Sequence, residues 1–312
     1  MRKIVVRWLL TAVPLVLGVS MLTFVLASLV PGDAARAILG VNASPAQYVA
    51  LRRQLHLDEP LWQQYVHWLA AAVHGDLGQS LQSSDAVTHE LSGRLGVTLS
   101  LVGGAVLVAT AVGVGLGVAS ALRGGFLGRL VDVGSLLGLA VPSYWLGLVL
   151  VALFAVALPL FPATGYTPAA DSVGGWLASL VLPVLTLGLG SSAPIAKQTR
   201  DGVLAELGRE YVMVLRARGV PEWSVIFRHV LRNAATPVLS VVGLVVVGLF
   251  GGAVLAETVF VLPGLGGLAV SAASTHDIPV IQGVAVVFTL LVVGVNLVVE
   301  IGYAALNPKV RM

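Results

Sequence analysis

Six stretches of this chain are each long and apolar enough to cross a lipid bilayer. A membrane-spanning helix needs about 20 apolar residues, and a backbone in lipid must satisfy its own hydrogen bonds. None of the stretches shows the strict alternation of a membrane barrel strand. They predict an all-α polytopic membrane protein with spans at about Trp8–Val30, Thr98–Leu122, Val133–Leu158, Trp176–Ala196, Val238–Ala256 and Ile281–Leu306.

The composition agrees with a chain that lies mostly in lipid. Hydrophobic residues make up 57% and charged residues 11%, whereas soluble domains are about one quarter charged. The absence of cysteine excludes a disulfide framework and thiol chemistry. Three pairs of glycines spaced four residues apart indicate ordinary close packing of helices; they are Gly113/Gly117, Gly134/Gly138 and Gly248/Gly252.

Basic residues predict the orientation of the chain, because cytoplasmic loops are enriched in Lys and Arg. They occur at the N-terminus, in the 121–131 loop, in the 197–236 loop with seven of them, and in the C-terminal tail, whereas loops 159–175 and 257–280 have none. Six spans place all four basic regions on one side, so we expect both termini in the cytoplasm. The first apolar run exceeds the roughly 7–15 residues of a signal-peptide core, and we expect it to be a retained span.

Residues 31–97 form a sizeable segment on the opposite side of the membrane. Its sequence predicts amphipathic helices with an aromatic face of Trp62, Tyr65 and Trp68, which suits a membrane interface. His67 and His74 lie seven residues apart and would share a helix face. Since no third ligand has suitable spacing, we expect an interfacial helix and no metal site.

The most polar part of the second half, residues 210–237, predicts a helical elbow between two spans. Gly219 can end one helix because it tolerates left-handed backbone angles. Pro221 suits the first turn of the next helix, where its missing N–H is not needed. A short Arg-rich elbow that projects from the membrane is suited to docking a soluble partner.

Two classes of function are disfavoured by what the chain lacks. Its charged span residues, Asp132, Lys197, Glu257 and Glu300, all lie toward span ends. This argues against a carrier coupled through a mid-membrane carboxylate. No lysine follows a glycine, so the phosphate loop of a nucleotide site is absent, and no nucleophile elbow of the Gly-x-Ser-x-Gly type occurs. We therefore expect a subunit that is not an enzyme and has no catalytic residue, metal or cofactor of its own.

Several motifs follow one another in an order that is typical of one family. They are Pro31-Gly32-Asp33, LRRQLHLDEPLWQQYVHWL, Gly75-Asp76-Leu77-Gly78, Val141-Pro142-Ser143-Tyr144-Trp145-Leu146-Gly147, Pro162-Ala163-Thr164-Gly165-Tyr166, Leu182-Pro183-Val184-Leu185-Thr186-Leu187-Gly188, GGAVLAETVFVLPGLGGL, Ile278-Pro279-Val280-Ile281-Gln282-Gly283, Asn296-Leu297 and Leu306-Asn307-Pro308. With these motifs the chain resembles the permease subunits of dipeptide and oligopeptide ABC importers, a branch of the type I ABC importer fold.

The resemblance implies that the elbow is the coupling helix, which docks on a cytoplasmic ATPase. The residues it assigns to this role are Glu210, Arg216, Ala217, Arg218, Gly219, Val220, Pro221 and Glu222, with Arg232-Asn233-Ala234 and Pro237 at its close. The chain departs from the family pattern at Met213, Val214 and Leu215, where smaller and more polar residues are usual, at Gly267 in place of Arg, and at Asn307 in place of Asp.

A second candidate site follows from the Glu-Thr-Val-Phe run and the Pro-Gly-Leu-Gly turn that the family keeps together. We expect this region to border the outer gate or to contact the binding protein. The alternative is an ordinary helix-end carboxylate in a structured loop. The residues concerned are Glu257, Thr258, Phe260, Pro263 and Gly264.

The resemblance also implies an organisation and a set of partners. Residues 1–93 would form the first span with the outer helical segment, and residues 94–307 a permease domain of five spans with the coupling helix at about 210–236. The expected partners are a homologous second permease subunit, two cytoplasmic ATPase subunits or domains that bind ATP and Mg, an extracytoplasmic substrate-binding protein and membrane lipid, but no nucleic acid. The expected location is the bacterial inner membrane, with multiple passes.

Alternatives stay open at this point. Within the family the cargo includes dipeptides, longer peptides, haem, nickel complexes and glutathione, and the sequence does not choose among them. A self-sufficient secondary carrier needs an internal coupling site. A membrane scaffold or receptor would use the elbow only to bind a cytoplasmic partner.

Overall fold

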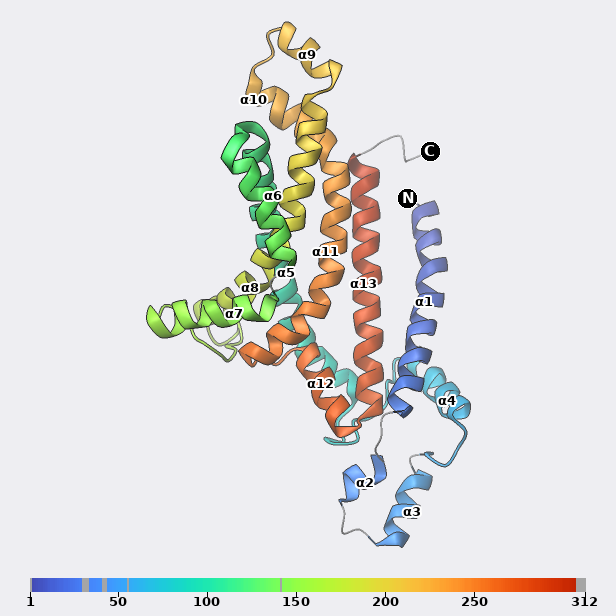
Figure 1. The fold of residues 1–312 in the computed structure, drawn as a ribbon. Helices are drawn as coiled ribbons and strands as arrows, with labels where there is room; N and C mark the ends of the chain where they lie inside the picture. The colour runs from blue at the N-terminus through green and yellow to red at the C-terminus, as the bar shows by residue number, and fades with distance from the viewer. Residues whose placement is uncertain (1, 30–33, 41–43, 55, 141, 307–312) are drawn as a thin grey trace. The chain divides into compact units, whose positions relative to one another are not determined.

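The computed structural model describes residues 2–29, 34–40, 44–54, 56–140 and 142–306, and these residues are mostly helical (Figure 1). The helices are α1 (Arg2–Leu29), α2 (Ala34–Leu39), α3 (Pro45–Gln54), α4 (Leu61–Val73), α5 (Val87–Arg123), α6 (Gly125–Ala140), α7 (Ser143–Val151), η1 (Ala152–Ala157), α8 (Val173–Leu207), α9 (Glu210–Ala217), α10 (Glu222–Ser224), η2 (Val225–Val230), α11 (Leu231–Phe260), α12 (Leu265–Thr275) and α13 (Ile278–Leu306). Within these ranges β-pairing is limited to one isolated bridge, between Gln79 and Ala86. The prediction of an all-α chain is confirmed.

The chain divides into two compact units whose sequences interleave. Unit 1 comprises Leu99–Leu262 with Gly294–Met312, and unit 2 comprises Arg2–Thr98 with Pro263–Val293. The predicted boundary at residue 93 separates the first span and outer segment from the permease domain. It describes functional parts of the chain and not compact units, and it stays a prediction. The family motifs at residues 31–33 and 307–308 lie outside the described residues.

The centre of unit 1 is α8, which contacts α6, α7 and α11. Its first turn is capped by Ser172, whose Oγ accepts a hydrogen bond from the Gly175 amide at 3.1 Å. The helix continues through Pro183 and Pro194. Prolines are tolerated inside spans where neighbouring helices and hydroxyl side chains satisfy the backbone groups they free.

Two glycines of α5 lie directly against α8. A Cβ atom placed on Gly113 would come within 2.8 Å of the Ser192 carbonyl oxygen, and one on Gly117 within 2.6 Å of the Ala196 carbonyl oxygen. The close packing predicted for this glycine pair is therefore confirmed. The other two pairs differ, because Gly134 and Gly248 have no atom within 4 Å of such a Cβ and Gly252 meets only the end of Leu187, at 3.2 Å.

The third predicted span, Val133–Leu158, is not one straight helix. Helix α6 ends at Ala140, and Pro142 becomes the N-cap of α7, with backbone angles of −62° and 131°. Proline has no N–H for the helical ladder and its ring disfavours a helical residue before it, so the chain turns at this point. Figure 1 shows α7 and η1 running across the direction of α6.

Five helical segments in the described part of the chain are long and apolar enough to cross a membrane. They are Leu10–Leu29, Val87–Arg123, Val173–Leu207, Glu222–Phe260 and Ile278–Tyr303, with Tyr144–Ala157 as a shorter apolar helix. Each overlaps one of the predicted spans, and Val87–Arg123, Val173–Leu207 and Glu222–Phe260 extend well beyond theirs. The count of six and the cytoplasmic placement of the termini stay predictions.

Unit 2 is held by an apolar core and by long-range hydrogen bonds. Its core comprises Val87, Leu91, Leu265, Leu268, Ala272, Val280 and Val284. The Trp8 indole donates to the Val293 carbonyl at 2.8 Å, which joins α1 to α13. Thr98 Oγ1 accepts a hydrogen bond at 2.9 Å from the Leu265 amide, one of the amides at the start of α12 that lack a helical partner.

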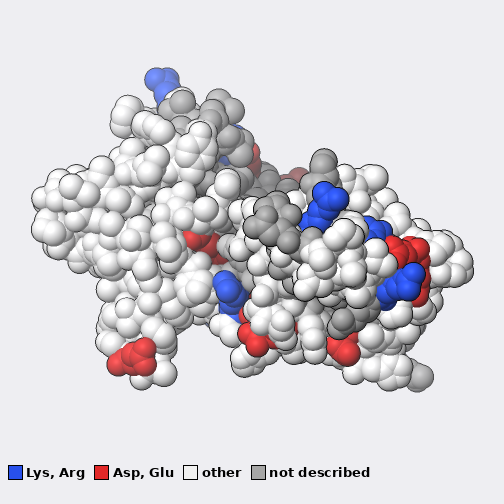
Figure 2. Space-filling view, turned by 90° about the horizontal axis from the view of Figure 1, so that it is seen from below, with Lys and Arg blue, Asp and Glu red and all other residues white. Residues whose placement is uncertain are grey.

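Acidic and basic side chains are sparse on the face of the molecule shown in Figure 2.

The glycine contact between α5 and α8 makes a prediction about stability. Gly117→Ala places a methyl group where backbone and side-chain atoms of α8 already lie, so we expect destabilisation by about 1–3 kcal/mol. Gly103→Ala on the same helix enters open space and should leave stability unchanged or raise it, since alanine favours helix. Thermal unfolding of the purified chain measures both, and equal melting temperatures would contradict the packing.

Candidate functional site

The predicted elbow is present between α8 and α11 in unit 1. It consists of α9, the turn at residues 218–221, α10 and η2, and we call residues 210–230 the elbow. In Figure 1, α9 and α10 stand beyond the ends of α8 and α11. The arrangement of helix, glycine, proline and helix is as the sequence predicted.

The turn follows from Gly219. Its φ is +73°, a left-handed angle that glycine adopts without steric cost. The Gly219 amide donates to the Arg216 carbonyl at 2.9 Å and the Val220 amide to the Leu215 carbonyl at 3.1 Å. This pair of bonds is the Schellman motif, which satisfies the last carbonyls of a helix. Pro221 lies one residue earlier than expected, as the N-cap of α10.

An ion pair closes the turn from outside. Arg216 Nε lies 3.0 Å from Glu222 Oε2, and its Nη2 bonds the other carboxylate oxygen. The carboxylate raises the pKa of Arg216 above its usual value. Both side chains are about half exposed, at 46% and 52%, so the pair fixes the geometry of the turn more than it stabilises the fold. Arg218 and Arg228 are exposed and have no ion-pair partner within the described ranges.

An apolar core lies beneath the elbow and joins it to three long helices. Val212 of α9 and both ends of η2, Val225 and Val230, are fully buried. They pack in one cluster with residues of α5, α8 and α11, which are Val118, Ala121, Val203 and Ala234. Because the elbow shares its core with these helices, a displacement of one moves the others.

A polar contact ties the same elements together. The Tyr211 hydroxyl donates to Glu206 Oε2 at 2.9 Å, and it accepts a hydrogen bond from Asn233 Nδ2 at 3.2 Å. Burial is the main cause of a raised pKa at Tyr211. Asn233 belongs to the Arg-Asn-Ala motif just after the elbow, at the start of α11, and this contact holds α9 against α11. Tyr211 was not among the predicted site residues, since no local pattern links it to Asn233.

The exposed surface of the elbow carries apolar side chains among its charged ones. Met213 is 62% exposed, Val214 50% and Trp223 67%, and the neighbouring Ala217, Arg218 and Pro221 are also exposed. Exposed apolar side chains gathered in one place mark interaction surfaces in soluble surroundings. Of the three elbow residues that depart from the family pattern, Met213 and Val214 are thus on the surface, whereas Leu215 packs on the core with Val220.

The second candidate site is divided between the two units. In unit 1, Glu257 and Phe260 are buried at the end of α11, while Thr258 is exposed and donates to the Val254 carbonyl at 2.8 Å. The Phe260 carbonyl accepts from the Gly165 amide at 2.9 Å. In unit 2, Pro263 is exposed and Gly264 is the N-cap of α12. The role in a gate or in binding-protein contact stays a prediction.

The two histidines considered for a metal make other contacts. His67 Nδ1 lies 3.3 Å from Glu59 Oε2, and His74 Nδ1 lies 2.8 Å from the Ala70 carbonyl of its own helix. A group of three side chains that could hold a metal ion does not occur in the described part of the chain.

Comparison with known families identifies the class of protein. Residues 111–312 match the family described as the inner membrane component of binding-protein-dependent transport systems, and residues 1–102 match the N-terminal domain of such membrane components. The chain belongs to this family, so it is a type I ABC transporter permease and a multi-pass inner membrane protein.

Individual relatives cover its whole length. The chain is 40% identical over 312 residues to a protein of Brucella abortus (strain 2308) named as a peptide transport system permease, covering 100% of this chain and 99% of that protein. It is 36% identical over 308 residues to a peptide ABC transporter permease protein of Sinorhizobium fredii, with 98% of each chain covered. It is 34% identical over 336 residues to the dipeptide transport system permease protein DppB of Escherichia coli (strain K12), covering 100% of this chain and 99% of that one.

The left-handed angle at Gly219 makes a prediction about the elbow. Gly219→Val forces a β-branched residue into a conformation that costs L-residues roughly 1–2 kcal/mol, so we expect the Gly219 and Val220 hydrogen bonds to open more often. Hydrogen exchange of the residue 219–220 amides should then accelerate about tenfold, since 1.4 kcal/mol corresponds to a factor of ten. Gly219→Asn should exchange more slowly than the valine variant because asparagine tolerates this angle. Identical amide exchange rates in the wild-type, Gly219→Val and Gly219→Asn chains would show that the turn does not depend on a left-handed angle at residue 219.

Proposed function

We propose that this chain is the permease subunit of an ATP-driven importer of dipeptides or oligopeptides, and that its elbow docks on a cytoplasmic ATPase. The chain would form half of the translocation pathway, with a homologous permease subunit as the other half. Two ATPase subunits would bind ATP and Mg, and an extracytoplasmic binding protein would deliver the peptide. The names of the relatives, which refer to peptide and dipeptide transport, support this choice of cargo.

One observation carries the docking part of the proposal: the elbow is packed on a shared core beneath and presents exposed apolar side chains outside. Its buried valines share a core with α5, α8 and α11, while Met213, Val214 and Trp223 are exposed. An exposed helix face with these side chains suits a hydrophobic groove on a partner, since anchors of this kind dominate docking energies. The shared core then gives a path by which movement of the partner reaches the spans.

The charged residues near the spans fit a subunit that is driven from outside. Asp132 of α6 pairs at 3.1 Å with both Lys197 and Arg200 of α8, and Lys197 also pairs at 3.0 Å with Asp201. Two acidic and two basic side chains thus neutralise one another. A cluster that is already paired supports a packing role between α6 and α8 over a role in ion coupling.

The docking surface makes a prediction about coupled transport. Met213→Asp places a charge on the apolar face of the elbow without touching its core. In proteoliposomes that contain the whole complex and the binding protein, we expect ATP-dependent uptake of a labelled dipeptide to fall at least about tenfold, because burying an unpaired charge at an interface is costly. Val49→Asp, at another exposed aliphatic residue, should transport like the wild type.

The other outcomes distinguish the alternatives. Uptake that continues without ATP would replace this proposal by a secondary carrier. ATP hydrolysis with no uptake of dipeptides or longer peptides would retain the transporter class but overturn the peptide cargo in favour of haem, nickel or glutathione. Equal uptake by the Met213→Asp and wild-type complexes would remove docking from this face of the elbow.

A further inference from the structure

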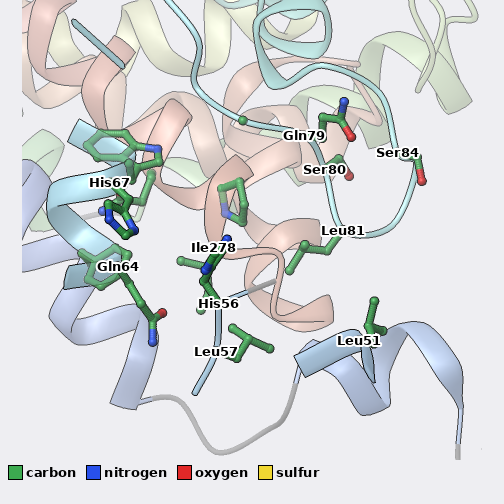
Figure 3. Close-up of a pocket in the computed structure, with 15 residues that line it drawn as sticks. Leu51, His56, Leu57, Gln64, His67, Gln79, Ser80, Leu81, Ser84 and Ile278 are labelled. Atoms are coloured by element: carbon green, nitrogen blue, oxygen red, sulfur yellow. The ribbon is translucent and has the colours of Figure 1, made fainter. Parts of the chain in front are cut away.

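Unit 2 contains a cavity of about 550 Å³ with a lining of mixed character (Figure 3). Its lining residues include His56, His67, Gln64 and Ser84, which are polar, together with aliphatic residues such as Leu57. Polar groups from several segments do not single out one class of ligand. A groove in unit 1 has a simpler lining, and that lining is the better guide to an occupant.

The groove in unit 1 lies between α5, η2 and the start of α11, and we call it the α5–η2 groove. Its volume is about 430 Å³. One side is a face of α5 from Val114 to Arg123, where the lining positions recur every four residues, and the other side is Phe227 and Leu231. The lining part of α5 is about 14 Å long at 1.5 Å per residue. The groove therefore has the elongated form that suits a hydrocarbon chain.

The groove has free space at its floor and is open on its outer side. A Cβ atom on Gly115 would have no atom within 4 Å, whereas one on Gly113 or Gly117 would strike α8. Packing within the protein thus occupies one face of this stretch of α5 and leaves the face with Gly115 uncovered. Leu122 and Phe227 are 42% and 60% exposed, so a molecule can enter from the side.

Positive charge is concentrated at one end of the groove. Arg123 is the last residue of α5, and the other lining residues are Gly, Ala, Val, Leu and Phe. Two more arginines follow lining residues directly in the chain, Arg228 after Phe227 and Arg232 after Leu231. All three arginines are exposed, and none has an ion-pair partner within the described part of the chain. The groove is thus apolar along its length and cationic at or beside its end.

This combination of apolar and cationic surface distinguishes the possible occupants. An exposed apolar groove in a membrane protein is covered by lipid or by another protein. A facing transmembrane helix rarely carries charge and would leave Arg123 without an anion, whereas an anionic phospholipid supplies both an acyl chain and a phosphate. Guanidinium groups form strong, charge-assisted hydrogen bonds with phosphate. The sequence predicts the end of α5 and the elbow on the cytoplasmic side, where basic pockets between spans bind anionic headgroups.

We propose that the α5–η2 groove binds an anionic phospholipid, with an acyl chain against Gly115 and Ala119 and the headgroup at Arg123. The bound lipid would contact α5 and, through Phe227, the elbow. The lipid composition of the membrane would then influence the position of the elbow. This site lies apart from the exposed apolar residues that we assign to ATPase docking, and it does not depend on which cargo is transported.

Site-specific photo-crosslinking in the whole transporter complex tests the site. Phe227→p-benzoylphenylalanine keeps an aromatic ring in the groove wall and reacts with whatever lies against it. The complex is placed in nanodiscs of equal parts phosphatidylglycerol and phosphatidylethanolamine with identical acyl chains, and the radiolabel is carried by one lipid or the other. We expect phosphatidylglycerol to be crosslinked in excess. The same substitution at Leu107, which is 73% exposed on α5 and outside the groove, should crosslink both lipids equally.

An arginine variant identifies the group that selects the headgroup. Arg123→Gln should lower the excess of phosphatidylglycerol about fivefold, which is the effect of one basic residue near a membrane surface. The matched control is Arg129→Gln, at an exposed arginine of the same predicted loop that does not line the groove. It should keep the excess.

A second pair of variants tests the acyl-chain part of the site. Gly115→Leu fills the groove from its floor, and we expect crosslinking of both lipids at residue 227 to be lost while Arg123 is still in place. Gly103→Leu on the same helix also enters open space, but it lies outside the groove and should crosslink like the unsubstituted chain.

Three outcomes would overturn the inference. Equal crosslinking of the two lipids at residue 227 would show that only bulk lipid covers the groove. A crosslink to another polypeptide, seen as a band at the summed mass, would make the groove an interface with a second permease or an ATPase. Equal crosslinking by the Gly115→Leu and Gly103→Leu complexes would show that no acyl chain lies against Gly115.

Discussion

The arrangement of unit 1 depends on how closely α5 can approach α8. Gly113, Gly117 and Gly188 lie at this contact, and a Cβ on any of them would come within 3.0 Å of neighbouring atoms. Apolar side chains gain little by leaving lipid for another apolar surface, so helices in a membrane associate through close packing. Helix α8 also contacts α6, α7 and α11. The distance between α5 and α8 that these glycines allow therefore sets the positions of the helices on which the elbow packs.

The features that were predictable from the sequence are those that local patterns determine. Runs of apolar residues predicted five helices that the structure contains, and Gly219 with Pro221 predicted the turn of the elbow. Pro142 shows the limit of this approach, because the residues around it are apolar enough for a span. Hydropathy measures only side-chain polarity, so it does not reveal that a proline, which has no N–H, separates two helices here. Which side of the membrane each end occupies depends on a bilayer, which the fold alone does not define.

The candidate sites were predictable to different degrees. Exposed elbow residues follow one another along the chain, whereas the core beneath them joins Val118 of α5 to Val225 of η2, a pairing that no local pattern reveals. The cavity in unit 2 was not predicted, because it brings Phe24, Trp68 and Gln282 together from distant segments. His67 illustrates the difficulty, since its spacing suggested a common face with His74, while its Nδ1 lies 3.3 Å from Glu59 Oε2.

The second arm of the elbow is continuous with a helix that is long and apolar enough to cross a membrane. Glu222–Phe260 forms one helical segment of 39 residues, which at 1.5 Å per residue is about 58 Å long, nearly twice the hydrocarbon thickness. The part beyond Pro237 acts as a lever arm: from Pro237 to Phe260 it is about 36 Å long at 1.5 Å per residue, and a tilt of about 10° displaces its far end by roughly 6 Å. The π-helical turn η2 and Pro237 lie near the elbow end, where such irregularities allow bending, so the fulcrum is closer to the elbow. A small rotation there is therefore magnified at Phe260.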